Sequence, residues 1–403
     1  MPGASVTEVA AAETLILSNI PRLTIERLAL AECVGRVLRE DVFAERPQPP
    51  FDRVTMDGIA LAHRDWASGM RAFEITGTQA AGTPQLAVER VGQCVEVMTG
   101  AMLPAGTDTV VPVERIERAG RVAAVSAPAV ERGQFVHTAG GDRTAGSVLL
   151  TAGTRIGAPE SAVLASSGQA TFAVARLPHA AVISTGDELV DAGQPIAPYQ
   201  IRSSNDYAIE ASLTAQRLAT VTRARLADDA AALAGAIAEL HDRTDLLILS
   251  GGVSMGQFDF VPAVLERLGA EVVFHRIQQK PGRPMWFGMS AQRKPIFALP
   301  GNPVSTLVCA TRYILPALRS AAGLGPAPPE YVTLAAQAQA SAELTYFLPV
   351  KLTWSTAGAA LAEPRPTNTS GDFVSLAGTD GFVQLAARRE PYPAGTAARL
   401  FRW

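Results

Sequence analysis

The sequence predicts a multidomain protein of α/β and β structure, organised around a central doubly wound α/β domain. Strand-like apolar segments alternate with helical segments from residue 179 to residue 318, as in a parallel sheet covered on both faces. Short strand-like segments also fill residues 71–125, and a further group lies between residues 331 and 403. We therefore expect a helical linking domain (1–46 and 146–178), an inserted β-rich domain (47–145), the α/β domain (179–326) and a C-terminal β-barrel-like domain (327–403).

The composition favours a folded, cytoplasmic protein with a small-molecule partner. Of its 403 residues, 48% are hydrophobic and 18% are charged, so the chain is long enough for several cores. The net charge of −3 and the lack of a dense Lys/Arg run give no electrostatic case for nucleic acid, and no apolar run reaches membrane-spanning length. Cys33, Cys94 and Cys309 form no CxxC pair, so neither a disulfide framework nor a zinc site is expected.

The linking domain is expected to be helical on both sides of the insertion. Thr7 can cap a helix that turns Val9 and Ile16 inward, and residues 25–38 repeat the same spacing. Residues 159–167 return to helical spacing after the insertion. We interpret these segments as scaffold.

The inserted domain offers three polar turns among short strands, which are expected at residues 73–75, 94–98, 110–116 and 122–125. Asp57-Gly58 presents a carboxylate, although an ordinary hairpin turn is an alternative interpretation. Thr99-Gly100 follows a strand, where a hydroxyl and free N–H groups could meet a ligand or simply form a β-turn. The third turn is Gly140-Gly141-Asp142.

The α/β domain has strand-like segments at residues 180–183, 220–225, 246–249, 271–277 and 296–299, and helical segments at 205–216, 229–240 and 261–268. Residues 300–305 are expected to open a last helix that runs to residue 318. Ligands bind such sheets outside the carboxyl ends of the strands. The turns that follow the strands carry Glu188, Asp228, Asp259, Lys280 and Ser305, which we expect along one rim.

The loop after residues 246–249 is the strongest single feature of that rim. Ser250, Gly251 and Gly252 break the strand, and glycines there let backbone N–H groups approach an anion closely. Asp259 follows at the start of the next helix and could hold a metal. The alternative is a tight strand-to-helix turn whose glycines only relieve backbone strain.

The C-terminal domain has strand-like segments at residues 332–335, 350–354 and 382–385. Its loop at residues 367–372 offers hydroxyl groups to an anion, and an ordinary polar loop is the alternative.

Taken together, these loops resemble the molybdopterin molybdenumtransferase family, the MoeA-type proteins related to the E domain of gephyrin. The resemblance covers nearly the whole chain. It rests on residues 51–60, 98–108, 140–142, 182–189, 250–259, 280–284 and 300–305, in that order. It implies a homodimer of four-domain subunits, with the α/β domain of one subunit facing the inserted domain of the other.

The resemblance also implies a reaction, in which adenylylated molybdopterin and molybdate give molybdenum cofactor and AMP with the help of Mg²⁺. The implied catalytic residues are Asp57, Glu188, Asp228 and Asp259, of which Asp57, Glu188 and Asp259 also hold the metal. Substrate binding is implied for Thr99, Asp142, Ser184, Thr185, Gly186, Gly251, Gly252, Ser254, Pro300, Gly301 and Asn302. Molybdate would be received by Arg276, Lys280, Ser305 and Ser370, because cationic donors neutralise and orient the dianion.

One departure from the family pattern concerns the oxyanion. Pro349 stands where a molybdate-binding arginine is common, while Ser370 retains a partner hydroxyl. Lys351 is expected on the opposite strand face and so is not expected to replace that arginine. The choice between molybdate and tungstate is left open by this substitution.

Two other functions compete with this one. A catalytically idle molybdopterin-binding scaffold predicts a groove without turnover, and the four acids Asp57, Glu188, Asp228 and Asp259 argue against it. A molybdopterin adenylyltransferase would share the α/β fold, and the two β modules and the chain length argue against that function. The adenylyltransferase and acceptor molybdoenzymes are instead expected as partners.

Overall fold

The computed structural model describes residues 6–253 and 260–403, which form two compact units. The first unit contains the residues up to Glu40, Ala152–Gly157 and Thr171–Trp403. The second contains Asp41–Thr151 and Ala158–Ala170. The division into four domains therefore stays a prediction at a finer level than these two units. No helix among the described residues is long and apolar enough to cross a membrane.

The first unit is built on a six-stranded sheet with the order β16-β13-β17-β21-β20-β18. The strands are β13 (His179–Thr185), β16 (Thr220–Leu226), β17 (Leu246–Ser250), β18 (Glu271–His275), β20 (Trp286–Met289) and β21 (Pro295–Leu299). The first four strands in the order are parallel, and β20 and β18 complete the sheet in antiparallel fashion. The predicted doubly wound sheet is confirmed, with an antiparallel edge that the sequence did not indicate.

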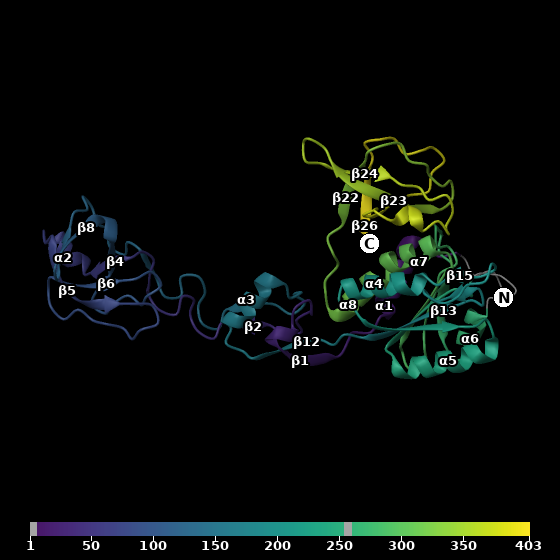
Figure 1. The fold of residues 1–403 in the computed structure, drawn as a ribbon, viewed down its shortest axis with the longest axis horizontal. Coiled ribbons are helices and arrows are strands. Elements are labelled where there is room, and N and C mark those ends of the chain that lie inside the picture. Colours follow the sequence, from purple (N-terminus) through teal and green to yellow (C-terminus); the bar gives the residue numbers. More distant parts are fainter. Residues whose placement is uncertain (1–5, 254–259) are drawn as a thin grey trace. The chain divides into compact units, whose positions relative to one another are not determined.

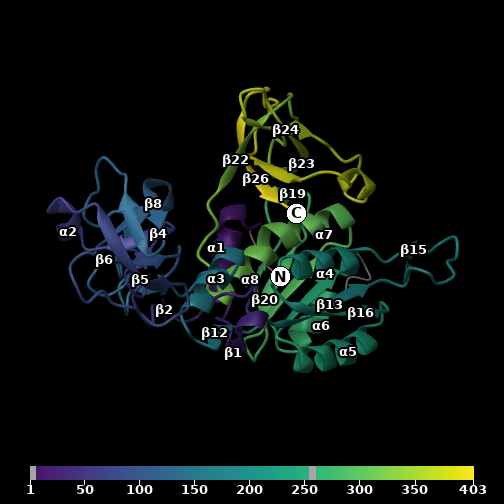
Figure 2. The ribbon, with the colours of Figure 1, turned by 60° about the vertical axis from the view of Figure 1, so that its left-hand side comes forward.

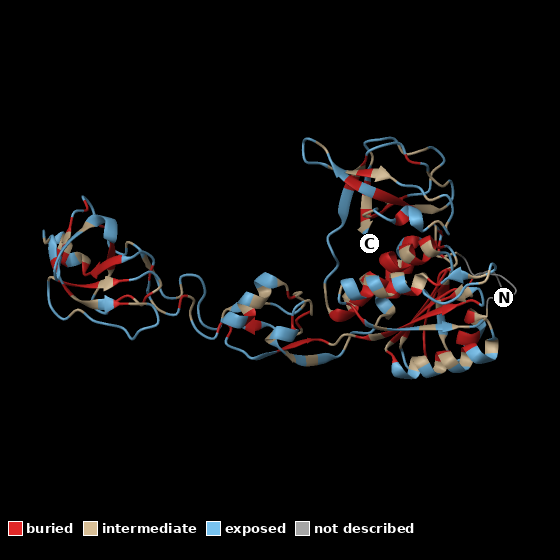
Figure 3. Cartoon of the chain, viewed as in Figure 1, coloured by how far each residue is buried: buried red, intermediate tan, exposed pale blue. Residues whose placement is uncertain are grey.

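Helices cover both faces of this sheet (Figures 1 and 2). One face packs on α1 (Val9–Asn19), α4 (Asn205–Ala215), α7 (Pro303–Cys309) and α8 (Leu315–Ala322), and the other on α5 (Ala230–Arg243) and α6 (Val261–Arg267). Successive residues of β17 alternate between the two cores, which explains why Leu246–Leu249 is apolar without interruption. Figure 3 shows the central strands buried throughout.

Two local features determine where helices of this unit begin and how they are joined. Asp229 caps α5, since its Oδ1 accepts hydrogen bonds from the N–H groups of Ala231 (3.1 Å) and Ala232 (2.7 Å). A π-helical turn at Ala310–Ile314 joins α7 to α8, so one helical segment runs from Pro303 to Ala322. Its first turn follows the carboxyl end of β21 and faces the rim where ligands of such sheets bind.

The C-terminal strands close into a five-stranded barrel, because β23 pairs with both β24 and β25 in the order β23-β24-β22-β26-β25. The strands are β22 (Glu330–Leu334), β23 (Thr345–Trp354), β24 (Ala360–Pro364), β25 (Gly381–Leu385) and β26 (Ala397–Arg402). The short strand β19 (Gln279–Lys280) of the α/β domain pairs with β23. The predicted barrel-like domain is confirmed, although β24 and β26 gave no clear signal in the sequence.

The second unit holds the predicted small β module, a six-stranded sheet with the order β7-β4-β6-β5-β9-β8. Its strands are β4 (Gly58–Leu61), β5 (Ala72–Gln79), β6 (Gln93–Val97), β7 (Thr109–Pro112), β8 (Ile116–Ala119) and β9 (Val122–Val125). Two short pairs, β3 (Arg53–Val54) with β10 (Val136–His137) and β2 (Val42–Phe43) with β11 (Val148–Leu150), accompany it. The unit also contains helices α2 (His63–Ala67) and α3 (Ala158–Ser166).

Two predicted segments are wrong. Residues 25–38 are not a helix: β1 (Ile25–Ala29) pairs with β12 (Thr171–Ala175), and only a 3₁₀ turn, Leu30–Glu32, follows. A short apolar spacing fits either element, and pairing with a strand distant in sequence decided between them. The expected strand at 110–116 is interrupted by a 3₁₀ turn at Val113–Arg115 and continues as β8.

Candidate active site

A cavity of about 670 Å³ opens at the carboxyl ends of the parallel strands. It lies where the chain, after placing β16 on one side of β13, crosses to place β17 on the other, which is the switch point at which such sheets bind ligands. We call it the switch-point cavity. Its lining includes Ser184, Thr185, Glu188, Arg202, Asn205, Asp228, Ser250, Gly251, Gly252, Pro300, Gly301, Asn302 and Phe373.

Two buried hydroxyl groups at the end of β13 lack hydrogen-bond partners among the described residues. Ser184 is 1% exposed and Thr185 is 4% exposed, yet neither Oγ of Ser184 nor Oγ1 of Thr185 is paired. An unsatisfied buried polar group costs roughly 1–3 kcal/mol of folding free energy. Both residues line the cavity, so a ligand with hydrogen-bonding groups would remove that cost.

The glycines at the end of β17 are required by close packing. Gly251 and Gly252 have φ of +100° and +64°, a backbone region that other residues rarely adopt. A Cβ on Gly251 would lie 2.5 Å from the carbonyl oxygen of Thr185. The loop thus brings its backbone against the end of β13, as the anion-cradle interpretation requires, although relief of strain accounts for the same glycines.

Asn205, at the start of α4, holds two cavity loops together. Its Nδ2 donates to Oγ of Ser250 (2.8 Å) and to the carbonyl of Gly301 (2.7 Å). The sequence prediction missed this residue, and it also missed Arg202 and Phe373 in the lining. An amide just after the polar run Arg202-Ser203-Ser204, at the start of a predicted helix, was the available signal.

Two of the three acidic residues expected along the rim, Glu188 and Asp228, belong to the described part of the chain. Glu188 and Asp228 both line the cavity, and the N–H of Asp228 donates to Oδ1 of Asp187 (3.1 Å). Gly186, which follows β13, has φ of +149° and lies against Glu188, since a Cβ there would be 2.6 Å from Oε2 of Glu188. Asp259 and Ser254 lie outside the described residues. Within the described part of the chain, no three His, Cys, Asp or Glu side chains form a ready-made metal cluster.

A second cavity, of about 330 Å³, adjoins the first, because Pro284, Pro300 and Asn302 line both. We call it the oxyanion cavity. Its charged lining residues in the described structure are Lys280 and Arg283, and no acidic residue accompanies them. Such a site favours an anion.

The hydroxyl groups of the oxyanion cavity come from two domains. Ser305, in the first turn of α7, is 3% exposed, and Ser370 comes from the loop after β24. Asn302 links the two cavities, since its Nδ2 donates to Oγ of Ser370 (2.7 Å), and the N–H of Val304 donates to the Ser370 carbonyl (3.1 Å). Lys280, Ser305 and Ser370 are therefore brought together as the resemblance implies.

Arg276 is absent from the linings of both cavities. Its carbonyl accepts a hydrogen bond from the N–H of Thr7 (3.1 Å), and its own N–H donates to Met285 (2.8 Å). Pro349, in contrast, lines the oxyanion cavity, where the resemblance would place an arginine.

Three predicted site residues, Asp57, Thr99 and Asp142, belong to the second unit. Oδ1 of Asp57 accepts from the N–H (2.6 Å) and the hydroxyl (2.7 Å) of Thr99, and these two bonds lower the pKa of Asp57 below its usual value. Gly58 begins β4, which pairs with β6 and β7, whereas the preceding strand β3 pairs with β10, so Asp57-Gly58 is not the turn of a two-stranded hairpin.

Asp142 forms part of a short polar chain. Nε2 of His137 lies 3.1 Å from Oδ1 of Asp142, and Arg53 lies 3.2 Å from Nδ1 of the same ring. Asp57 and Asp142 are both exposed. The bonds from Thr99 favour the charged form of Asp57, which suits a role in binding a cation or a polar substrate.

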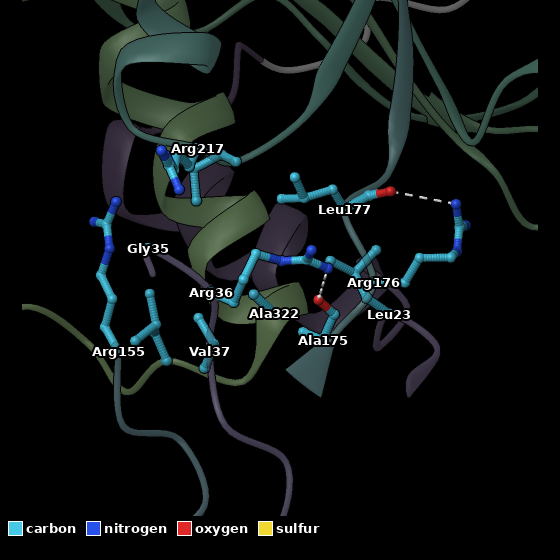
Figure 4. Close-up of a pocket in the computed structure, with 12 residues that line it drawn as sticks. Leu23, Gly35, Arg36, Val37, Arg155, Ala175, Arg176, Leu177, Arg217 and Ala322 are labelled. Atoms are coloured by element: carbon cyan, nitrogen blue, oxygen red, sulfur yellow. Dashed lines mark hydrogen bonds between the residues drawn. The ribbon is translucent and has the colours of Figure 1, made fainter. Parts of the chain in front are cut away.

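A further cavity of about 10 Å³ lies among Arg36, Arg155, Arg217 and neighbouring apolar residues (Figure 4). The Arg36 guanidinium points across it and donates to the Ala175 carbonyl (2.7 Å). The space holds about one water molecule, so it is too small for a substrate.

Family models match almost the whole chain. Residues 7–168 match the MoeA N-terminal region (domain I and II), residues 181–320 a probable molybdopterin binding domain, and residues 331–400 the MoeA C-terminal region (domain IV). The matches follow one another in the order of the described elements.

Full-length relatives share this organisation. A protein of Synechocystis named molybdopterin molybdenumtransferase is 38% identical over 397 residues, covering 98% of this chain and 99% of its own length. A Bacillus subtilis protein of the same name is 31% identical and covers 93% of this chain and 89% of its own. A crystal structure of a molybdopterin biosynthesis MoeA protein from Pyrococcus horikoshii superposes with a TM-score of 0.84 at 30% identity, covering 99% of each chain.

Proposed function

The chain belongs to the molybdopterin molybdenumtransferase family and is thus a transferase of molybdenum cofactor biosynthesis, and we propose that it inserts molybdate into adenylylated molybdopterin with release of AMP. The observation that supports this reaction best is the pair of adjoining cavities. Among the described residues, one cavity is lined by two carboxylates and by two hydroxyl groups that lack partners, and the other is lined by two cations and no acid. A phosphate-bearing dithiolene and a tetrahedral dianion need two such sites side by side.

In this proposal the switch-point cavity binds the adenylylated molybdopterin. Ser184 and Thr185 donate their unpaired hydroxyls to phosphate oxygens, and the loop of Gly251 and Gly252 brings backbone N–H groups within reach. Asn205 holds the loops that contain Ser250 and Gly301 next to each other by donating a hydrogen bond to each. The substrate is thereby held with its phosphoanhydride beside Glu188 and Asp228.

Mg²⁺ fits the donor set of this cavity. In phosphoryl sites it binds through carboxylates together with substrate phosphates, and Glu188 offers one carboxylate in this lining. We assign the metal to Glu188 with Asp57 and Asp259, and when bound it would neutralise charge on the phosphates. Asp228 lines the same cavity, and in this proposal it accepts a proton from the water that attacks the phosphoanhydride, so no protein nucleophile is needed.

The oxyanion cavity receives molybdate in this proposal. Lys280 and Arg283 neutralise the dianion, and the hydroxyls of Ser305 and Ser370 orient it toward the neighbouring cavity. Arg276 stays among the residues proposed to receive molybdate, although it lines neither cavity in this structure. Pro284, Pro300 and Asn302 line both cavities, so the two substrates would lie next to each other.

A homodimer is part of the proposal, because the resemblance assigns Asp57, Thr99 and Asp142 to the site of the other subunit. The proposed partners are a molybdopterin adenylyltransferase, which would supply the substrate, and acceptor molybdoenzymes, which would take the product. A cytoplasmic location fits such partners.

The test is incubation of the purified chain with adenylylated molybdopterin, Mg²⁺ and molybdate. We expect AMP release that depends on molybdate, with active cofactor appearing in step. A scaffold would bind the substrate without releasing AMP, and an adenylyltransferase would make adenylylated molybdopterin from molybdopterin and ATP. Either result would replace the proposed reaction.

A further inference from the structure

The oxyanion cavity lacks the arginine that the family resemblance places at position 349, and Pro349 lines it instead. We propose that Arg365, on the neighbouring strand, supplies the missing guanidinium to the bound oxyanion. This inference rests on the proposed function, since it concerns the same cavity. It assigns to this chain a specificity-determining residue that its sequence motifs do not indicate.

The pairing of β23 with β24 places Arg365 opposite Pro349. Strands β23 and β24 are antiparallel, with Val350 opposite Pro364 and Lys351 opposite Glu363. The N–H of Arg365 donates to the carbonyl of Pro349 (2.8 Å), which extends the ladder by one pair. Pro349 and Arg365 are therefore directly opposite each other. Side chains of directly opposed residues project from the same face of a sheet, with Cβ atoms about 5 Å apart.

That face is the one that meets the oxyanion cavity. Pro349 is buried and lines the cavity, so the side chain of Arg365 projects from the cavity side of the sheet. The loop that follows Arg365 supplies Thr367, Asn368, Thr369 and Ser370 to the same lining. Two residues of extended chain span only about 7 Å, which is within the length of an arginine side chain.

The present partner of Arg365 holds it weakly. Nη2 of Arg365 lies 2.9 Å from Oε2 of Glu363, and the two side chains are 49% and 44% exposed. Ion pairs this exposed contribute little, because water solvates both groups and salt screens them. A dianion in the cavity is a stronger partner, since a guanidinium offers a planar fork of donors to a tetrahedral oxyanion.

Lys351 can take over Glu363 when Arg365 turns to the oxyanion. Contrary to the sequence expectation, residues 349 and 351 share one face, because they are two positions apart on the strand. Lys351 is opposite Glu363, so that carboxylate keeps a cationic neighbour. Neither Lys351 nor Arg365 lines the cavity in this structure, where Arg365 is paired with Glu363. Arg365 is the one of the two that is directly opposite Pro349.

The test is equilibrium binding of molybdate to the purified full chain by calorimetry, which needs no turnover. Arg365→Ala should raise the dissociation constant about tenfold, the loss expected for one charge-assisted hydrogen bond. Arg389→Ala, an exposed arginine of the same barrel outside the lining, should leave the constant unchanged. Glu363→Gln should lower it about twofold, because it frees Arg365.

Two further results separate this role from a structural one. If the Arg365–Glu363 pair merely stabilised β24, Glu363→Gln would weaken binding as Arg365→Ala does, and the proposal would be overturned. In the double variant Pro349→Arg with Arg365→Ala, we expect the wild-type affinity to return, since the guanidinium again projects from that face. Tight binding by Arg365→Ala alone refutes the role of Arg365 but leaves the proposed function intact, whereas no molybdate binding by the wild type refutes both.

Discussion

Thr185→Val should make the ligand-free protein more stable while it weakens substrate binding. Oγ1 of Thr185 is buried without a partner among the described residues, and valine has nearly the same shape. Removing an unsatisfied buried hydroxyl recovers part of its cost, of about 1 kcal/mol at the lower end of the usual range. A gain of that size raises the thermal midpoint by about 1 °C in a protein of this length.

The same hydroxyl is proposed to donate to a phosphate oxygen. Losing one hydrogen bond to a charged group costs about 1.5 kcal/mol of binding free energy, or roughly tenfold in affinity. The half-saturating concentration of adenylylated molybdopterin in AMP release should therefore rise about tenfold. Stability and binding thus change in opposite directions, which is the mark of a group buried for a ligand.

Thr311→Val is the matched control for this experiment. Oγ1 of Thr311 is also buried and unpaired in the described structure, but Thr311 lines a different cavity, near α1 and β26. This variant should gain stability to a similar degree and keep the wild-type half-saturation. If Thr185→Val lowers the thermal midpoint by several degrees and binds substrate as the wild type does, the reasoning about Thr185 is refuted.

Three further predictions concern the charged groups of the site. Glu188→Gln should fold normally and release AMP at least about 10²-fold more slowly, since a positioned carboxylate is lost, and a wild-type rate would remove Glu188 from the site. Lys280→Ala should raise the half-saturating molybdate concentration, whereas Pro349→Arg should lower it, and unchanged saturation in both would mean that molybdate binds elsewhere. Thr99→Val should raise the pKa of Asp57 part of the way to its usual value, because the hydroxyl bond is lost while the N–H bond stays. The stability that a lowered carboxylate pKa contributes is present above the unfolded-state pKa and is lost as the pH falls through the folded-state pKa, so the variant should lose this stability at a higher pH than the wild type. A carboxyl ¹³C NMR titration of Asp57 would detect the change in pKa.

The sequence was most informative where the backbone itself imposes the pattern. The uninterrupted run Leu246–Leu249 indicated a strand covered on both faces, and Gly251 and Gly252 proved to be positions where a Cβ would collide with neighbouring groups. Lys280 and Ser305 were expected along one edge of the sheet, and both line the oxyanion cavity. Ser370 lines it too, but it follows β24 of the barrel and was indicated only by the family resemblance.

The sequence was least informative where distant pairing decides the outcome. Residues 25–29 have a spacing compatible with a helix, and only pairing with Thr171–Ala175 makes them a strand. The hydrogen bonds of Asn205 to Ser250 and Gly301 join segments about fifty and a hundred residues away, which no local motif announces. The lack of partners for Thr185 could be recognised only from the packed structure, since it depends on every neighbouring atom.

The most direct test of the two-cavity account is a crystal structure of this chain with AMP and molybdate, with data collected at the molybdenum absorption edge. The account predicts one anomalous peak in the oxyanion cavity, beside Lys280, Ser305 and Ser370, and an AMP phosphate against Ser184 and Thr185 in the adjoining cavity. A molybdenum peak elsewhere, with the oxyanion cavity empty at saturating molybdate, would contradict it.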